Sequence, residues 1–222
     1  MSDVAQAQTV THSPDAIAID ILIQPDDATL HKARSINAQL RQNYPQGYAL
    51  DAAHLPHITL VQRFIHAKDL EAVKTAIEAV VKSQPLSSLQ LTASGYTVST
   101  WGDTGILLLN IDPTSQLKQL ASKVIEAVQP YSVSGGTPEA FVRSPGEQID
   151  PKTVQWVENF VPAHSGEHYE PHITLGLAHP DFLTKLKTAP FQPLTIHPAE
   201  IAIYQLGNVG TAQKKLAGWP AR

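Results

Sequence analysis

The chain has 222 residues, a formal net charge of −4 and no cysteine. This length can bury a substantial core, either as one large domain or as two small ones. The acidic balance argues against a protein that coats long duplex nucleic acid, because such binding depends on many Lys and Arg contacts to phosphates. The absence of cysteine excludes disulfides, thiolate catalysis and cysteine-ligated zinc.

The N-terminal segment, Met1 to Pro14, is polar and has neither the basic start nor the apolar stretch of a signal peptide. We therefore expect a short flexible leader over residues 1–14 and a single domain over residues 15–222. Eighteen consecutive apolar residues occur nowhere in the sequence, so no transmembrane helix is predicted. A soluble, cytoplasmic protein without a membrane partner is expected.

The first third of the domain alternates apolar strands with amphipathic helices. Ala16–Ile23 is rich in isoleucine and bounded by prolines, which indicates a buried strand. Asp26 or Asp27 can cap a helix that extends to about Asn43. A second helix is predicted over about Lys68–Lys82, where apolar residues recur at helical spacing.

The middle of the chain predicts a hairpin followed by a helix. Leu89–Ser99 and Thr104–Ile111 are expected to be two strands joined by a turn. Asp112, followed by a proline, is expected to cap a helix that extends to about Val128. The stretch between Tyr131 and Glu170 is less regular, and loops of this length are often binding loops or lids.

The last elements complete an α+β pattern with helices packed outside sheets. A short helix, about Pro151–Phe160, is expected within the irregular stretch, with Asp150 as its cap. A second short helix is predicted near Asp181–Lys187, and Ile201–Leu206 predicts one more strand.

The pentapeptide Pro-His-Ile-Thr-Leu occurs twice, at Pro56–Leu60 and at Pro171–Leu175. In a strand, alternate side chains point to opposite faces, so each copy would bury its Ile and Leu and present its His and Thr. The pairs so presented are His57 with Thr59 and His172 with Thr174.

Two such strands would supply both groups that acid–base chemistry on a phosphate needs. Imidazole has a pKa close to neutrality, so a pair can offer one neutral base and one protonated acid at the same pH. Threonine supplies a short, stiff hydroxyl that can hold an anionic oxygen. His57 and His172 are thus the candidate catalytic residues, and Thr59 and Thr174 the candidate phosphate-binding residues.

At these residues the sequence resembles the 2H phosphoesterase superfamily, named for two His-x-Thr/Ser motifs, which includes 2′-5′ RNA ligase-like proteins and cyclic nucleotide phosphodiesterases. The resemblance covers most of the chain. It implies two pseudo-symmetric lobes, each an antiparallel sheet with helices outside, that face each other across a central cleft. Outside the motifs the two halves share little sequence, so we treat the chain as one bilobal domain.

The resemblance and the chemistry together predict a metal-independent cyclic phosphodiesterase, a hydrolase that opens a 2′,3′-cyclic phosphate or a related small nucleotide or RNA-end phosphodiester. One histidine would be the general base and the other the general acid, and the sequence does not assign the two roles. A non-catalytic nucleotide or RNA-end binding protein is an alternative. A 2′-5′ RNA ligase-like activity in the reverse direction is another. We expect a monomer without a cofactor.

Other residues near the motifs are candidates for substrate contact, and each has a structural explanation as well. Aromatic residues could stack on a base or pack in the interior, and arginines could contact a phosphate or remain surface charges. The candidates are Tyr48, Arg63, Trp101, Phe141, Arg143 and Tyr169.

One departure from the family pattern limits the prediction. Many 2′-5′ RNA ligase-like proteins have an arginine after the second motif, whereas here the motif is followed by Gly176-Leu177-Ala178. This leaves the identity of the substrate open.

The pairs His54 with His57 and His168 with His172 have spacings that metal ligands can have. The proline before His172 disfavours the helix that the second spacing requires. No metal is predicted.

Overall fold

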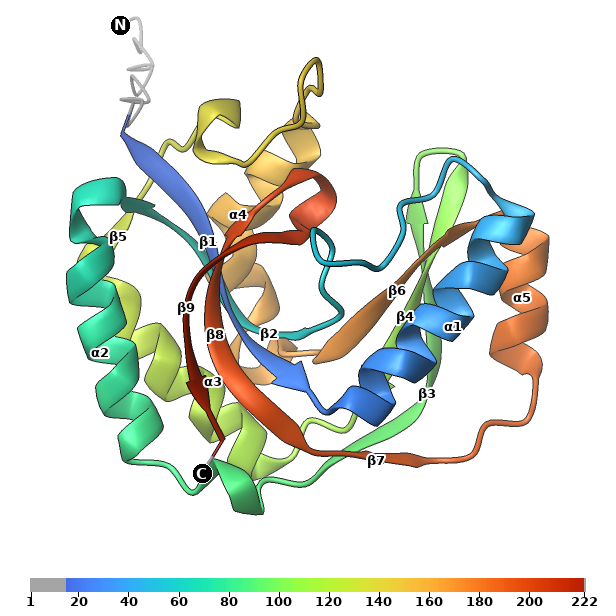
Figure 1. The fold of residues 1–222 in the computed structure, drawn as a ribbon, viewed down its shortest axis with the longest axis horizontal. Coiled ribbons are helices and arrows are strands. Elements are labelled where there is room, and N and C mark those ends of the chain that lie inside the picture. Colours follow the sequence, from blue (N-terminus) through green and yellow to red (C-terminus); the bar gives the residue numbers. More distant parts are fainter. Residues whose placement is uncertain (1–14, 222) are drawn as a thin grey trace, which may run out of the picture.

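The computed structural model describes residues 15–221, and the expected leader lies outside them. The chain forms two antiparallel sheets that meet in a V (Figure 1). The first sheet contains β1 (Ala16–Pro25), β2 (Ile58–His66), β5 (Ser132–Val133), β8 (Pro198–Leu206) and β9 (Ala212–Pro220), in the order β5-β2-β1-β8-β9. The second contains β3 (Leu91–Trp101), β4 (Thr104–Ile111), β6 (His172–Ala178) and β7 (Leu194–Ile196), in the order β6-β4-β3-β7.

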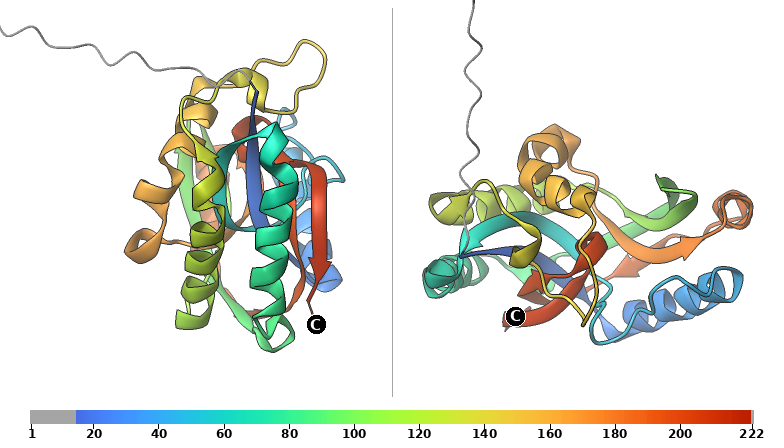
Figure 2. Two further views of the ribbon diagram at one scale, coloured as in Figure 1. Left: turned by 90° about the vertical axis from the view of Figure 1, so that its left-hand side faces the viewer. Right: turned by 90° about the horizontal axis from the view of Figure 1, so that it is seen from above.

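Helices cover the outer faces of both sheets, as predicted (Figures 1 and 2). Beside the first sheet lie α2 (Leu70–Lys82) and α3 (Ser115–Val128), and on the second lie α1 (Asp27–Asn43) and α5 (Pro180–Thr188). A fifth helix, α4 (Pro151–His164), packs against β2. The predicted bilobal α+β class is therefore confirmed. No helix within residues 15–221 is long and apolar enough to cross a bilayer.

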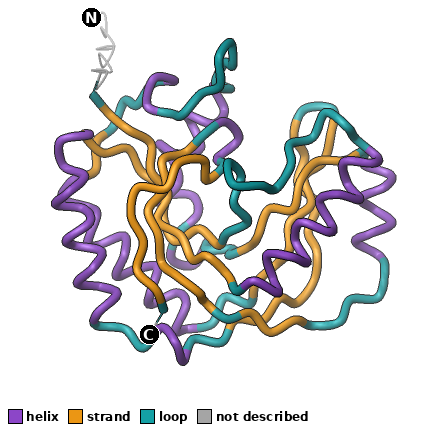
Figure 3. Tube along the Cα trace, in the orientation of Figure 1, coloured by secondary structure: helices purple, strands orange, loops and turns teal. Residues whose placement is uncertain are grey.

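The two lobes are not successive halves of the chain. Strands from the beginning and the end of the sequence, together with the short β5, build the first sheet, and β3, β4, β6 and β7 build the second, as the sequence colours of Figure 1 show. Figure 3 marks the strands of both sheets in orange. Helix α1 follows the first strand of one sheet yet packs on β6 of the other. The sequence did not predict the strands β5, β7 and β9. β9 pairs with β8 along its whole length, and its polar, half-exposed residues lack the apolar pattern of a buried strand.

Helix caps agree with the sequence at two places and differ at a third. Asp26 caps α1 by accepting a 2.9 Å hydrogen bond from the Thr29 amide, and Asp150 caps α4 by accepting a hydrogen bond from the Lys152 amide. The prediction that Asp112 caps α3 is wrong. The hydroxyl of Thr114 accepts the Leu117 amide instead, so α3 begins two residues later, and the proline after Asp112 precedes the helix.

A β-bulge interrupts each motif strand at the same position. In β2, Leu22 lies opposite Thr59 but Ile21 lies opposite Val61, so the residue after Thr59 is unpaired. In β6, Leu108 lies opposite Thr174 and Leu107 lies opposite Gly176. The repeat thus continues beyond the five identical residues into backbone geometry.

Candidate active site

The two motifs expose and bury their residues as alternating strands should. Ile58 and Leu60 are fully buried, as are Ile173 and Leu175. The His and Thr residues between them are only partly buried and line one cavity of about 400 Å³ between the sheets. The cavity brings together all four residues that the sequence singled out, namely His57, Thr59, His172 and Thr174.

Both histidine rings are oriented by the same kind of hydrogen bond to a backbone carbonyl. His57 Nδ1 lies 2.6 Å from the carbonyl oxygen of Leu55, and His172 Nδ1 lies 2.8 Å from that of Glu170. Each acceptor is two residues before its histidine, and a proline lies between them. Proline has a fixed φ and keeps the residue before it extended. A carbonyl can only accept, so Nδ1 carries a proton in both rings, and Nε2 is the atom left for chemistry.

The two Nε2 atoms have different surroundings because a buried carboxylate lies beneath the first motif. Asp20, in the middle of β1, is fully buried. Its Oδ2 accepts hydrogen bonds from the Thr59 hydroxyl at 2.8 Å and from Gln62 Nε2 at 2.9 Å. The same oxygen lies 3.3 Å from His57 Nε2. Both nitrogens of the His57 ring therefore face acceptors, which is the arrangement of a protonated imidazolium.

The surroundings move the pKa values of the two histidines in opposite directions. Burial alone lowers the pKa of His57, but the hydrogen bond and the negative charge of Asp20 outweigh burial and raise the pKa above its ordinary value. Burial lowers the pKa of His172, and the nearby charge of His57 lowers it further. The carbonyl and the carboxylate of Glu170 raise this pKa but do not outweigh the lowering effects. At a pH between these two pKa values, the ring of His57 is charged and that of His172 is neutral.

The two threonines are also unequal. The Thr59 hydroxyl donates its proton to Asp20, whereas the Thr174 hydroxyl has no hydrogen-bond partner among residues 15–221 and lines the cavity. Thr174 is thus free to donate to a bound oxygen. Thr59 presents lone pairs to the cavity as long as it is bonded to Asp20.

Helix α4 supplies an aromatic wall that the sequence did not predict. Trp156 is 39% exposed, and its ring stacks on that of His164 with centroids 4.0 Å apart. Both residues line the cavity together with Phe160. The predicted helix ended at Phe160, whereas α4 continues to His164, so this stacked pair was missed.

A strained turn closes the cavity next to the first motif. Val209 has φ +57°, in the left-handed region that a β-branched residue rarely adopts. Its amide donates to Thr153 Oγ1 and to Asn208 Oδ1, both at 3.1 Å. Since Val209 and Gly210 line the cavity, the strain is located at the site.

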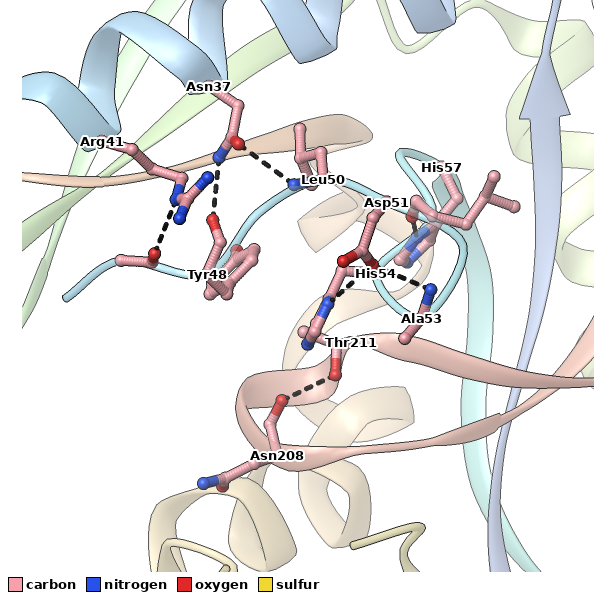
Figure 4. A network of polar contacts seen from close by, with 12 residues as sticks. Asn37, Arg41, Tyr48, Leu50, Asp51, Ala53, His54, His57, Asn208 and Thr211 are labelled. Atoms are coloured by element: carbon pink, nitrogen blue, oxygen red, sulfur yellow. Dashed lines mark hydrogen bonds and ion pairs between the residues drawn. The ribbon is translucent and has the colours of Figure 1, made fainter. Parts of the chain in front are cut away.

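Of the five further candidates whose side chains the structure describes, two line a cavity together with a motif residue. Tyr169 lines the cavity, and its hydroxyl donates to the Thr59 carbonyl at 2.8 Å. Tyr48 lies in a smaller adjoining cavity with His57 and stacks on His54. Figure 4 shows Tyr48 and His54 in the loop before the first motif, held by Asn37.

The other candidates lie elsewhere. Phe141 is buried and packs edge-on against Phe64, so it cannot stack on a base. Arg143 pairs with Glu139, outside the cavity lining. The bulge after Thr59 turns Arg63 to the opposite face from Thr59, into a separate polar cavity near Glu158. The side chain of Trp101 lies outside the described part of the structure.

Two residues complete the site, and only the first of them left a signal in the sequence. Asp20 interrupts an otherwise apolar strand, AIAIDILI, and a charge in such a strand is a signal of a buried functional group. Gln62 could not have been assigned to the cavity face, because only the bulge aligns it with Thr59. Within residues 15–221, no three His, Asp or Glu side chains are grouped as metal ligands.

Two sheets that each direct a His-x-Thr strand into a shared cavity form the arrangement that the resemblance to the 2H phosphoesterases implied. The chain belongs to the 2′-5′ RNA ligase superfamily, whose family model matches residues 25–208, well over half of its length. This finding confirms the resemblance drawn from the motifs. Among curated proteins, none matches the chain.

Several solved structures are similar over most of their length. E. coli LigT complexed with 3′-AMP is 13% identical, with a TM-score of 0.43, and the match covers 92% of this chain and 98% of LigT. The MHV ns2 PDE domain is 12% identical, with a TM-score of 0.44 and coverage of 92% and 100%. Kluyveromyces marxianus Usb1 with uridine monophosphate is 10% identical, with a TM-score of 0.42 and coverage of 93% and 99%.

Proposed function

We propose that this protein is a metal-independent phosphodiesterase that hydrolyses a 2′,3′-cyclic phosphate, or a related small nucleotide or RNA-end phosphodiester. The observation that carries the proposal is that His57 and His172 line one cavity while their environments favour opposite protonation states. A pair of this kind offers an acid and a base together at neutral pH.

In the proposed reaction, His172 is the general base and His57 the general acid. The Nδ1 proton of His172 is bound to the Glu170 carbonyl, so the Nε2 lone pair can take a proton from water. The water oxygen then bonds to phosphorus while one ribose oxygen leaves. His57 gives to that departing oxygen the Nε2 proton that faces Asp20 in the free protein, and the product is a ribose phosphomonoester.

Negative charge that develops on the phosphoryl oxygens needs donors that are already in place. Thr174 supplies a hydroxyl with no competing partner among the described residues. The imidazolium of His57 supplies a positive charge beside Asp20. Thr59 contributes through its position next to His57 and becomes a second donor only if its proton leaves Asp20.

Trp156 supports a nucleoside substrate. It lies on the wall of the same cavity, partly exposed, with its ring already backed by His164. A nucleobase can stack on an aromatic surface of this kind whatever its sequence identity.

The test is an assay of 2′,3′-cyclic mononucleotides with the purified protein and with His57→Ala and His172→Ala, in the presence and absence of chelator. Both variants should lose at least a hundredfold in kcat. His31→Ala, which removes an exposed imidazole on α1, should keep full activity. Full activity in either cleft variant would contradict the two-histidine mechanism, and nucleotide binding without product would favour a binding protein.

A further inference from the structure

Burial of the Asp20 carboxylate lowers the stability of the fold. It is the only charged residue of β1, and its side chain is fully buried. Its Oδ1 accepts no hydrogen bond within the described part of the chain, nor does Oε1 of Gln62 beside it. A buried carboxylate with half of its acceptors unused destabilises a protein relative to apolar residues of similar size.

The second lobe shows that the fold does not require this pair. Counted from the motif threonine and through the bulge, Gln62 corresponds to Leu177, and each is the third residue after its threonine. The residue opposite Gln62 is Asp20, and the residue opposite Leu177 is Ile106. The same bulged strand pair is thus built once with Asp and Gln and once with Ile and Leu.

This difference gives the two histidines different neighbours. Asp20 lies at ion-pair distance from His57 Nε2, and Ile106 lines the cavity at the equivalent place in the lobe of His172. The two rings share the carbonyl two residues back that binds Nδ1. The carboxylate in contact with Nε2 is present in the first lobe alone.

We propose that Asp20 is a positioning residue that holds His57 as the proton donor of the pair and thereby leaves His172 as the proton acceptor. It does so by placing one buried negative charge against Nε2 of His57 and by accepting the proton of the Thr59 hydroxyl. This inference rests on the proposed function and adds the reason for the direction of proton transfer.

The other ionisable groups around this network do not supply the same effect. Tyr169, before β6, and Tyr204, opposite Asp20 on β8, are kept neutral because burial raises their pKa values. His172 faces His57 from β6 and repels a second positive charge. Glu170 and His164 act on His172, and Asp20 is the carboxylate in contact with His57.

The first test is Asp20→Asn, which keeps the shape and an acceptor for Thr59 but removes the charge. The titration midpoint of His57, followed by NMR without substrate, should fall by about one pH unit or more. The falling limb of the pH profile of kcat/KM should move to lower pH by the same amount. Asp51→Asn removes the same charge from an exposed carboxylate that pairs with His54, and should leave both readouts unchanged.

The second test copies the other lobe into the first with Asp20→Ile and Gln62→Leu together. This variant should fold with an unfolding midpoint at or above that of the parent, because both buried unsatisfied acceptors are removed. His57 should then titrate below its ordinary value, as His172 does in the parent. The pair of variants keeps the test decisive even if one of them does not fold.

An unchanged His57 midpoint in either folded variant would overturn the role of Asp20. Because the NMR titration needs no substrate, it still decides this point if the protein turns over no phosphodiester. In that case the proposed function would be wrong, while the titration would still decide the role of Asp20. If both readouts move together, Asp20 acts on the catalytic pair and not merely on folding.

Discussion

The hydroxyl of Tyr169 donates a 2.8 Å hydrogen bond to the backbone carbonyl of Thr59. This bond ties the segment that leads into the second motif to the strand that carries the first. Tyr169 is buried, and burial raises its pKa, so the phenol stays a donor over the whole physiological range. The two motif strands are thus fixed to each other at the floor of the cavity.

Tyr169→Phe should therefore reduce stability and catalysis together. Loss of this buried hydrogen bond should lower the free energy of unfolding by about 0.5–1.5 kcal/mol. The rate should fall because the histidines lose their fixed separation. Denaturant unfolding and steady-state kinetics measure both. Tyr44→Phe, at a tyrosine whose ring contacts His179 at the edge of α1, is the matched control and should change neither.

The pH dependence of activity should be bell-shaped, with its two limbs on either side of the ordinary histidine pKa of about 6.5. The rising limb reports His172, whose pKa is lowered, and the falling limb reports His57, whose pKa is raised. The ion pair with Asp20 also stabilises the fold below about pH 6.5, and this contribution is lost as the pH rises through the folded pKa of His57. Two limbs assigned by NMR to the opposite residues would contradict the proposed roles.

The two threonines should respond differently to removal of the hydroxyl. Thr174→Val deletes a free donor to the phosphate and should lower kcat/KM by about a hundredfold. Thr59→Val deletes a donor to Asp20 and should act mainly through the pH profile of His57. Kinetics across pH distinguish the two effects. Equal losses at every pH would show that both hydroxyls hold the phosphate.

Trp156→Ala should weaken recognition of a base without impairing the chemistry. Stacking on an aromatic side chain contributes about 1–3 kcal/mol per base, so KM for a cyclic nucleotide should rise by about tenfold or more. Hydrolysis of ribose 2′,3′-cyclic phosphate, which has no base, serves as the control and should be unaffected. A comparable loss with both substrates would show that Trp156 shapes the cavity instead of stacking on the base.

Gly176→Ala should destabilise the second motif strand. Gly176 has φ +134°, and a Cβ there would lie 2.6 Å from Nδ2 of Asn37. That amide donates to the Leu175 carbonyl at the bulge, so the clash would also break a buried hydrogen bond. We expect a loss of at least about 2 kcal/mol in the free energy of unfolding. Gly95→Ala, where a Cβ meets no atom within 4 Å, should have little effect.

Prediction from the sequence succeeded where local pattern decides structure. The alternation of His and Thr with Ile and Leu placed both motifs on half-buried strands, and the helical spacing of apolar residues located α1, α2 and α5. It failed where partners are distant. Phe141 could not be distinguished from an exposed aromatic, because its burial depends on Phe64, far away in the sequence.

By itself the sequence determined the class of protein and its four motif residues, because the repeated pentapeptide and its strand period are local properties of the chain. Only the tertiary structure decided that the lobes interleave, that α4 brings Trp156 to the cavity, and that Asp20 lies under His57 but not under His172. The physical reason is the strand register. Two identical pentapeptides have the same local structure, but the register places Asp across the bulged strand in one lobe and Ile in the other, so the two histidines have different surroundings.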